Sequence, residues 1–160
     1  MKIIFPWLSL SVAVVIIDQL SKYLITRELH LYQIIQVLPI FNLTLAYNRG
    51  AAFSFLATAS GWQRWFFIFL SLGVSLILII WLYHARYKNT IWEMLGITLI
   101  LGGAWGNLID RVLLGYVVDF IQLHWQNWYF PTFNVADSAI TLGAGLLMID
   151  SLFTVPRRDI

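Results

Sequence analysis

Two acidic residues, Asp119 and Asp137, have the types and positions best suited to chemistry in this 160-residue sequence. Neither has a basic residue within four positions, so neither has an obvious local ion-pair partner. Asp119 lies in the apolar run 116–121, and Asp137 follows Asn134, a residue type that caps helices, by three positions. These positions predict that one acid follows a helix, that the other begins the next helix, and that both lie at one membrane face.

Two neighbouring carboxyl groups in a site of low dielectric cannot both ionise readily, so they share a proton. The ionised group can then take a proton from water while the protonated group polarises a peptide carbonyl, which is the chemistry of an aspartic protease. We expect Asp137, at the positive end of a helix, to be the ionised member and Asp119 to carry the proton. A purely helix-capping role for Asp137 is the competing interpretation.

Other ionisable side chains also interrupt apolar segments, where a charge is costly unless it is paired. Asp18 and Lys22 have the i, i+4 spacing of a helical ion pair, which would either satisfy itself or face a substrate. Asn107, Asp110 and Arg111 share one face of a later helix. For these we expect hydrogen bonds between helices, with Asp110 and Arg111 supporting each other.

Four apolar segments are long enough, or nearly so, to cross a membrane and must position these side chains. The predicted helices are about 6–25, 63–83, 92–114 and 137–155, with outer loops about 26–62 and 115–136, in one domain of residues 1–160. Ser60 and Thr90 begin capping boxes that end at Gln63 and Glu93. Pro156 is expected to stop the last helix.

The two outer loops carry different patterns. Residues 37–47 alternate partly with period two, which predicts paired strands on the membrane surface, and Arg49-Gly50 then supplies a turn. The loop 115–134 is dense in aromatic residues, as expected at a membrane interface. The predicted fold class is therefore a membrane all-α protein with four transmembrane helices, a small outer antiparallel β-sheet and an interfacial aromatic loop.

Composition indicates the same environment. The chain is 60% apolar and only 11% charged, with a mean hydropathy of +0.78, so it cannot coat a water-facing surface. The net charge of +2 without a basic tract argues against nucleic acid, and the absence of Cys excludes disulfides and thiolate chemistry. The apolar stretch 3–17 lacks a small-residue cleavage site, so we expect a retained first helix instead of a cleavable signal peptide.

An even number of helices places both termini on one side, and the distribution of cations favours the cytoplasm for that side.

A proton- or ion-coupled transporter is the main alternative function, because intramembrane acids also serve as relays. The sequence contains no H-E-x-x-H motif of a metalloprotease, no G-x-S-x-G motif of a serine protease and no presenilin-like G-x-G-D motif. A non-catalytic scaffold is a further alternative, and it would tolerate Asp119→Asn.

The sequence resembles lipoprotein signal peptidase, the type II signal peptidase of bacteria, over essentially its whole length. Five blocks in a fixed order carry the resemblance: Asp18-Gln19-Leu20-Ser21-Lys22, Tyr47-Asn48-Arg49-Gly50-Ala51-Ala52-Phe53-Ser54, Gly103-Ala104-Trp105-Gly106-Asn107-Leu108-Ile109-Asp110-Arg111, Val117-Val118-Asp119-Phe120 and Phe133-Asn134-Val135-Ala136-Asp137-Ser138. Each block alone is weak, but together they are highly specific. Trp105 stands where a smaller apolar residue is expected, which does not affect the chemistry.

This resemblance implies a membrane aspartic endopeptidase that cleaves diacylglyceryl-modified prolipoproteins on the N-terminal side of the lipidated Cys. It implies Asp119 and Asp137 as the catalytic pair, and these positions as substrate-binding or site-shaping: Asp18, Lys22, Asn48, Gly50, Asn107, Asp110, Arg111, Asn134 and Ala136. It further implies no metal or cofactor, inhibition by globomycin, contact with membrane lipid and a site towards the outer face of the bacterial inner membrane. We expect a monomer, although the sequence does not determine the oligomeric state. Lipobox preference and acyl-chain preference also stay open.

Overall fold

The computed structural model describes residues 4–50, 61–85 and 90–153, which form four helices and a four-stranded sheet. The helices are α1 (Phe5–Glu28), α2 (Trp62–Ala85), α3 (Ile91–Leu113) and α4 (Val135–Phe153). The strands are β1 (Ile34–Leu38), β2 (Phe41–Asn48), β3 (Val117–Trp125) and β4 (Trp128–Tyr129). The predicted fold class, mostly helical with a small antiparallel sheet, is confirmed.

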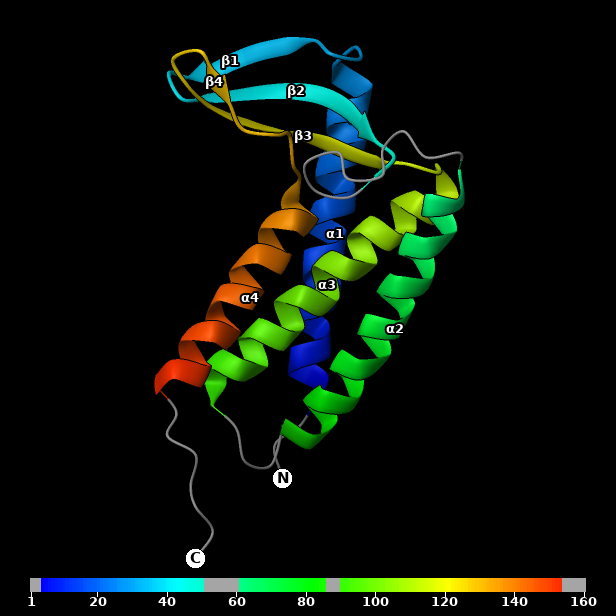
Figure 1. Cartoon of the computed structure of the whole chain (residues 1–160), viewed down its shortest axis with the longest axis vertical. Helices are drawn as coiled ribbons and strands as arrows, with labels where there is room; N and C mark the ends of the chain where they lie inside the picture. Colours follow the sequence, from blue (N-terminus) through cyan, green and yellow to red (C-terminus); the bar gives the residue numbers. More distant parts are fainter. Residues whose placement is uncertain (1–3, 51–60, 86–89, 154–160) are drawn as a thin grey trace, which may run out of the picture.

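The helices form a bundle, and the sheet lies across one end of it (Figure 1). The start of α1 and the end of α4 lie at the opposite end (Figure 1). Among the described residues, α1, α2 and α4 are long and apolar enough to cross a membrane. The fourth span that the sequence predicts, α3, has 23 residues but is not among these three helices.

The central position of α3 explains its composition, because this helix packs against α1, α2 and α4. Its glycines permit close approach: a Cβ on Gly96 would meet the Gly143 backbone of α4, and one on Gly103 would overlap the Ala136 carbonyl oxygen. Small residues at such contacts let helices pack closely in lipid. The polar face of α3 is therefore enclosed by protein and does not face lipid.

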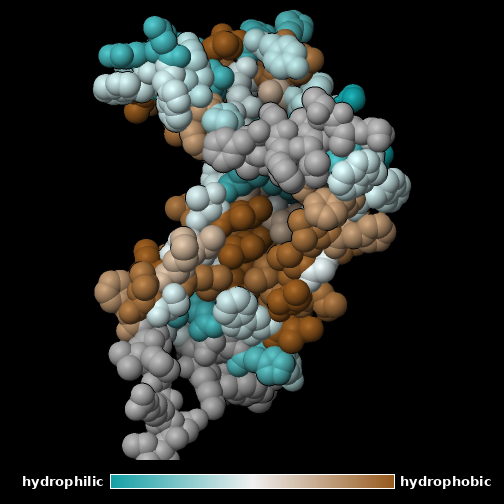
Figure 2. Space-filling model, in the orientation of Figure 1, coloured by the Kyte–Doolittle hydropathy of each residue, from teal (hydrophilic) through white to brown (hydrophobic). Residues whose placement is uncertain are grey.

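The outer surfaces of the helices are apolar. Large hydrophobic side chains such as Ile16, Phe69, Ile77 and Leu142 are exposed there. On the face that Figure 2 shows, hydrophobic (brown) residues gather over the helical part of the molecule. In water this exposure would be unfavourable, whereas in a bilayer these side chains contact lipid tails. The surface of the bundle thus agrees with a membrane protein.

The sheet has the order β1-β2-β3-β4 with antiparallel pairing throughout. In the sequence, residues 37–47 form one alternating pattern. In the structure a turn at Pro39-Ile40 divides this stretch, so that β1 ends at Leu38 and β2 begins at Phe41. Proline lacks an N–H and cannot continue the ladder, which accounts for the division. The pairing of Ala46 with Asp119 fixes the position of that acid in the sheet.

Short connections tie the sheet to the bundle. Only three residues separate α3 from β3, and Gly115 among them has φ +83°, a left-handed conformation that glycine adopts readily. Thr90 caps α3 as predicted, because its hydroxyl accepts a hydrogen bond from the Glu93 N–H at 3.2 Å. Ser60 and Pro156, to which the sequence assigns another cap and a helix stop, lie outside the described residues.

Candidate active site

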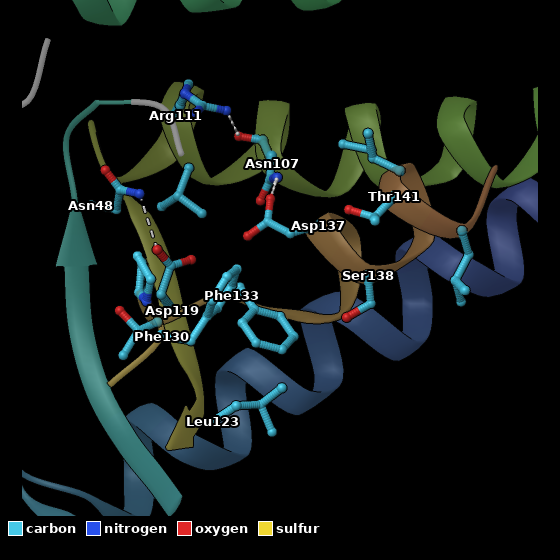
Figure 3. A pocket seen from close by; sticks show the side chains of 15 residues that line it. Asn48, Asn107, Arg111, Asp119, Leu123, Phe130, Phe133, Asp137, Ser138 and Thr141 are labelled. Atoms are coloured by element: carbon cyan, nitrogen blue, oxygen red, sulfur yellow. Dashed lines mark hydrogen bonds between the residues drawn. The ribbon is translucent and has the colours of Figure 1, made fainter. Parts of the chain in front are cut away.

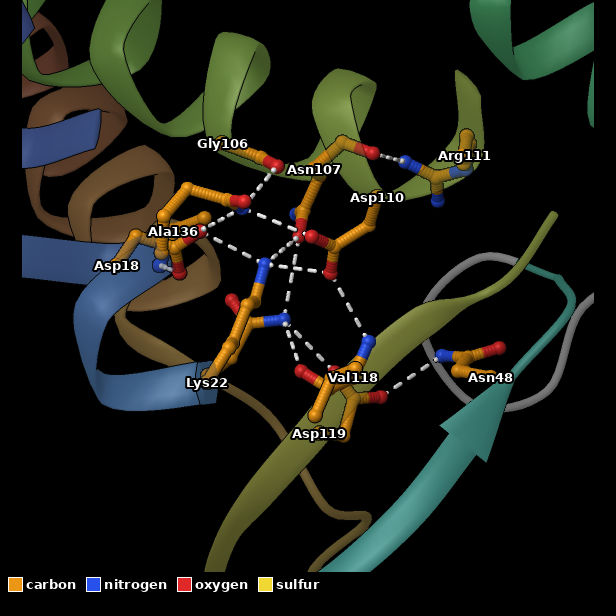
Figure 4. A network of polar contacts seen from close by, with 12 residues as sticks. Asp18, Lys22, Asn48, Gly106, Asn107, Asp110, Arg111, Val118, Asp119 and Ala136 are labelled. Carbon is orange, nitrogen blue, oxygen red and sulfur yellow. Dashed lines mark hydrogen bonds and ion pairs between the residues drawn. The ribbon is translucent and has the colours of Figure 1, made fainter. Parts of the chain in front are cut away.

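Asp119 lies in β3 directly over the bundle, and only 2% of its surface is exposed. Each of its carboxyl oxygens accepts one side-chain amide hydrogen bond. The Nδ2 of Asn134 donates to Oδ1 at 2.8 Å, and the Nδ2 of Asn48, at the end of β2, donates to Oδ2 at 3.1 Å (Figure 4). Neighbouring elements therefore hold the carboxyl group in a fixed orientation.

Asp137 lies in the first turn of α4, and Asn134 is the predicted N-cap of that helix. The cap is confirmed, since the Asp137 N–H donates to Oδ1 of Asn134 at 2.9 Å. In return, the Asn134 N–H donates to Oδ2 of Asp137 at 3.2 Å, which completes a reciprocal capping box. The other oxygen, Oδ1, accepts from the Nδ2 of Asn107 at 2.8 Å (Figure 3).

Two asparagines join the acids into one unit. Asn134 donates to Asp119 through its side chain and to Asp137 through its backbone. Asn107 donates to Asp137, and its own Oδ1 accepts from the Nδ2 of Asn134 at 3.2 Å. The two carboxyl groups that are 18 positions apart in the sequence are thus brought to one place by a shared pair of amides.

Both acids line a cavity of about 580 Å³ between the sheet and the bundle (Figure 3). Asn48, Asn107 and Arg111 line it beside the acids. The rest of the wall is largely apolar and comes from β3, the segment before α4 and the first turns of α4: Val117, Leu123, Phe130, Pro131, Thr132, Phe133, Ser138, Ile140, Thr141 and Leu142. The cavity therefore combines a polar end with an apolar lining.

Burial controls the protonation of Asp119. Burial, the larger cause, and the nearby charge of Asp137 together raise the pKa of this carboxyl group from 3.8 to about 7. The hydrogen bonds from Asn48 and Asn134 oppose the rise, because they stabilise the ionised form. Asp119 can therefore hold a proton close to neutral pH, as an acid catalyst requires.

A buried ionic network lies beside the acids, between α1 and α3 (Figure 4). The Nζ of Lys22 lies 2.7 Å from Oδ2 of Asp18 and 2.9 Å from Oδ2 of Asp110, and its side chain is 4% exposed. The predicted i, i+4 pair of Asp18 and Lys22 is confirmed. Asp110 finds its partner in Lys22, on another helix, and not in Arg111 as expected.

Asp18 and Asp110 also hold backbone groups of the neighbouring elements. Oδ1 of Asp18 accepts from the Ala136 N–H at 2.8 Å, which ties the start of α4 to α1. Oδ2 of Asp110 accepts from the Val118 N–H at 3.0 Å, which ties the start of β3 to α3. The network therefore positions the two segments that carry the acids, while Asp18, Lys22 and Asp110 are not among the residues lining the cavity.

Arg111, which lines the cavity, is hydrogen-bonded to Gly50. Arg111 donates to the carbonyl oxygens of Asn107 at 3.3 Å and Gly50 at 3.1 Å, and its guanidinium lies 5.0 Å from the centre of the Phe67 ring. All the site residues predicted from the sequence thus lie in or next to this one region.

The sequence reasoning did not assign a role to three kinds of residue found here. Gln19 donates to Oδ1 of Asp110 at 2.8 Å and to the Gly106 carbonyl at 3.1 Å. Arg64 of α2 donates to the carbonyls of Arg111 and Val112, both at 2.8 Å, at the end of α3. Ser138 and Thr141 line the cavity from α4. Polar residues spaced three or four apart within apolar helices were the available signal.

Within the described residues, no three His, Cys, Asp or Glu side chains gather as a metal site. The absence of a metal or cofactor stays a prediction of the sequence resemblance.

Comparison with known proteins places the chain in a family. The family profile of signal peptidase (SPase) II matches residues 10–153. Lipoprotein signal peptidase of Pseudomonas aeruginosa (strain UCBPP-PA14) is 56% identical over 147 residues, which cover 91% of this chain and 86% of the relative. That of Photorhabdus laumondii subsp. laumondii is 48% identical over 154 residues, covering 96% and 92%.

Two solved structures, both described as bacterial membrane enzymes determined by the in meso method, have the same fold. One, at 2.3 Å resolution, has a TM-score of 0.81 and 36% identity, covering 92% of this chain and 87% of that one. The other, at 1.9 Å, has a TM-score of 0.81 and 34% identity, covering 94% of each chain. Together with the profile match over nearly the whole chain, these similarities show that the protein belongs to the signal peptidase II family of membrane peptidases.

Proposed function

We propose that this protein is an aspartic endopeptidase that removes the signal peptide from diacylglyceryl-modified prolipoproteins, cutting on the N-terminal side of the lipidated Cys. The observation that carries the proposal is the convergence of Asp119 and Asp137 on one cavity, joined by Asn107 and Asn134. The names of its relatives, lipoprotein signal peptidase, support the substrate class.

In the proposed mechanism, Asp137 is the ionised acid and Asp119 the protonated one. Four N–H donors surround the pair, and the two that reach Asp137 come from Asn107 and from the helix cap. Asp137 takes a proton from a water molecule whose oxygen attacks the scissile carbonyl carbon, while Asp119 gives its proton to the carbonyl oxygen. The result is a neutral tetrahedral intermediate with two hydroxyl groups.

The second half of the reaction reverses the protonation states. Asp137, now protonated, gives its proton to the peptide nitrogen, and the C–N bond breaks. Asp119 takes back the proton from one hydroxyl as the carboxyl group of the signal peptide forms. The Cys amine is released, and the pair returns to its starting state, so one proton is always shared between the two acids.

Other residues at the site are proposed to hold the substrate. Arg111 and Asn48 line the cavity beside the acids, where charged and amide donors can bind peptide carbonyl groups. Gly50, held by Arg111, and Ala136, held by Asp18, lie next to residues of the site. The apolar lining suits a signal peptide and acyl chains, and a globomycin-type inhibitor would occupy the same space.

We further propose that the protein is a monomer of the bacterial inner membrane with cytoplasmic termini and four transmembrane helices, α3 included. The sheet end of the bundle, which holds the cavity, would then lie at the outer face. At that depth the diacylglyceryl chains of the substrate can stay in lipid while the amide bond reaches the acids.

The transporter alternative lacks support from the distribution of acids. Among the described residues, the buried acids are Asp18, Asp110 and Asp119, and all three belong to the cavity region and its adjoining network. A relay across the bilayer would need buried acids continuing towards the other end of the bundle.

The proposal is tested by cleavage of a purified diacylglyceryl-modified prolipoprotein, followed as a gel shift. Asp119→Asn and Asp137→Asn should each lower the rate by about 10²–10⁴-fold, because an amide can neither give nor take the proton. Asp150→Asn is the matched control: it changes an acid of α4 that bonds to Thr90, far from the cavity, and should cleave like the wild type.

Unmodified prolipoprotein, offered to the wild type, tests the requirement for the lipid. Full cleavage by either dyad variant would remove that aspartate from the mechanism, and equal cleavage of lipid-free substrate would refute the substrate class.

A further inference from the structure

Lys22 is the cation of the buried network, and its contacts extend beyond its two acid partners. Its ammonium also donates to Oδ1 of Asn107 at 3.1 Å (Figure 4). An ammonium group has three N–H donors and no acceptor, so the three neighbours Asp18, Asp110 and Asn107 use its full capacity. The lysine is 3% exposed and does not line the cavity, so a direct contact with substrate is not its role.

The contact with Asn107 determines which end of that amide faces the acids. A side-chain amide has an oxygen that accepts and an NH₂ group that donates. Because Lys22 only donates, the oxygen of Asn107 must face it, and the NH₂ group then faces Oδ1 of Asp137 at 2.8 Å. With the amide reversed, its oxygen would face the Asp137 carboxylate and its NH₂ group would face the ammonium, and both contacts would be repulsive.

The same orientation reaches the second acid. Oδ1 of Asn107 also accepts from the Nδ2 of Asn134, and that NH₂ group donates to Oδ1 of Asp119 at 2.8 Å. One buried cation is thus connected to both acids through two amides. Its positive charge also lowers the pKa of Asp119, against the larger rise caused by burial.

From these contacts we infer that Lys22 is a positioning residue for the acid pair: through Asn107 it fixes a hydrogen-bond donor on Asp137 and favours the ionised form of that carboxylate. This inference rests on the proposed function, since it assigns a role in the same reaction. Asn107 is the side chain that touches the reacting acid, and Lys22 acts through it.

Charged groups lie on every element around the Asp137 carboxylate. Arg111 from α3 and Asp119 from β3 interact electrostatically with Asp137. Asp18 and Lys22 from α1 and Asp110 from α3 form the adjoining network. Any test must therefore separate the hydrogen bond through Asn107 from a simple change in local charge.

The double variant Lys22→Met with Asp110→Asn makes this separation. The wild-type network contains one cation and two anions, a net charge of −1, and the double variant keeps only Asp18, again −1. The amide that replaces Asp110 still offers an oxygen to the Val118 N–H. The variant therefore removes the ammonium donor while the network keeps its net charge and its tie to β3.

The measurement is the pH dependence of kcat and KM for the lipid-modified substrate, with thermal melting to check the fold. Loss of the fixed donor should disfavour the ionised Asp137, so the acid limb of kcat should move up by about one pH unit. The maximal kcat should fall about tenfold with little change in KM, as for a group that acts on the reacting acid. Arg27→Met, which removes an exposed cation of α1, is the control and should leave the profile unchanged.

Each outcome decides the inference. A folded double variant with a wild-type profile overturns it, and so does a lower kcat with an unmoved acid limb, which would mark a general structural role. A double variant that does not fold also counts against it, since Lys22 would then serve assembly of the bundle. The proposed function is judged separately: it fails if Asp119→Asn or Asp137→Asn cleaves normally, whatever the Lys22 variants do.

Discussion

At the scale of single residues, Asn134 carries more constraints than either acid. It caps α4, donates to Asp119 and contacts Asn107, and it is fully buried. The same residue thus sets where α4 begins and where its first acid lies relative to β3. A helix cap is usually a local device, but here it also joins two distant segments of the chain.

The protonation of Asp119 leads to a prediction for the pH dependence of the reaction. The mechanism needs this residue protonated, and burial together with the nearby charge of Asp137 raises its pKa to about 7. As the pH rises through about 7, Asp119 loses its proton, so kcat/KM should fall about tenfold for each further pH unit. The measurement is kcat/KM against pH at constant ionic strength. A value that stays level from neutral into alkaline buffer would contradict the assignment of Asp119 as the acid.

At the scale of elements, glycines of α3 allow close contact with α1 and α4, and this contact helps to position the acids. A Cβ on Gly106 would lie 2.5 Å from Oδ2 of Asp18, and one on Gly103 would overlap the Ala136 carbonyl oxygen. Both contacts are next to the start of α4, where Asp137 lies. Close packing is therefore required at the same level of the bundle as the acid pair.

We predict that Gly103→Ala and Gly106→Ala each displace the start of α4. Overpacking of this kind costs about 1–3 kcal/mol, so the melting temperature in detergent should fall, and cleavage should fall with it because Asp137 moves. Gly145→Ala is the matched control, since a Cβ there meets nothing within 4 Å. The prediction fails if the α3 variants melt and cleave like the control.

Much of the element structure follows from local pattern. Hydropathy locates α1, α2 and α4, and residue type identifies Thr90 and Asn134 as caps. These features depend on residues within a few positions of one another. The pairing of β2 with β3, by contrast, depends on contacts between segments about 70–80 positions apart.

The site was predictable in its members but not in its connections. Acids without local partners stand out in an apolar sequence, which brings attention to Asp119 and Asp137. By contrast, the partner of Asp110 could not be predicted, because Arg111 is adjacent in sequence while Lys22, the actual partner, lies on another helix. Gln19 was missed for the same reason, since its contacts with α3 exist only after the helices pack.

At the scale of the whole molecule, the bundle has two unlike ends. The sheet and the cavity occupy one end, and the start of α1 and the end of α4 occupy the other (Figure 1). The proposed orientation puts the sheet outside the cell membrane and the other end in the cytoplasm.

The absence of Cys from the sequence allows a direct test of this orientation. Gln36→Cys, in the exposed strand β1, should react with a membrane-impermeant thiol reagent in intact spheroplasts. His84→Cys, exposed near the end of α2 away from the sheet, should react only after permeabilisation. The reverse labelling pattern would refute the orientation, and the cysteine-free parent protein measures background reaction.

The pair formed by Asp18 and Lys22 lies within a single helix, with the two residues one turn apart. Because α1 leaves the ribosome before α3 and α4, it carries its own counterion before those helices have been synthesised. A lone charge would oppose transfer of this helix into lipid, whereas a neutralised pair lowers that barrier. Asp110 and the Ala136 N–H then complete the coordination when the later helices arrive. The i, i+4 spacing of Asp18 and Lys22 thus lets the helices be synthesised in order without leaving an unpaired charge in the bilayer.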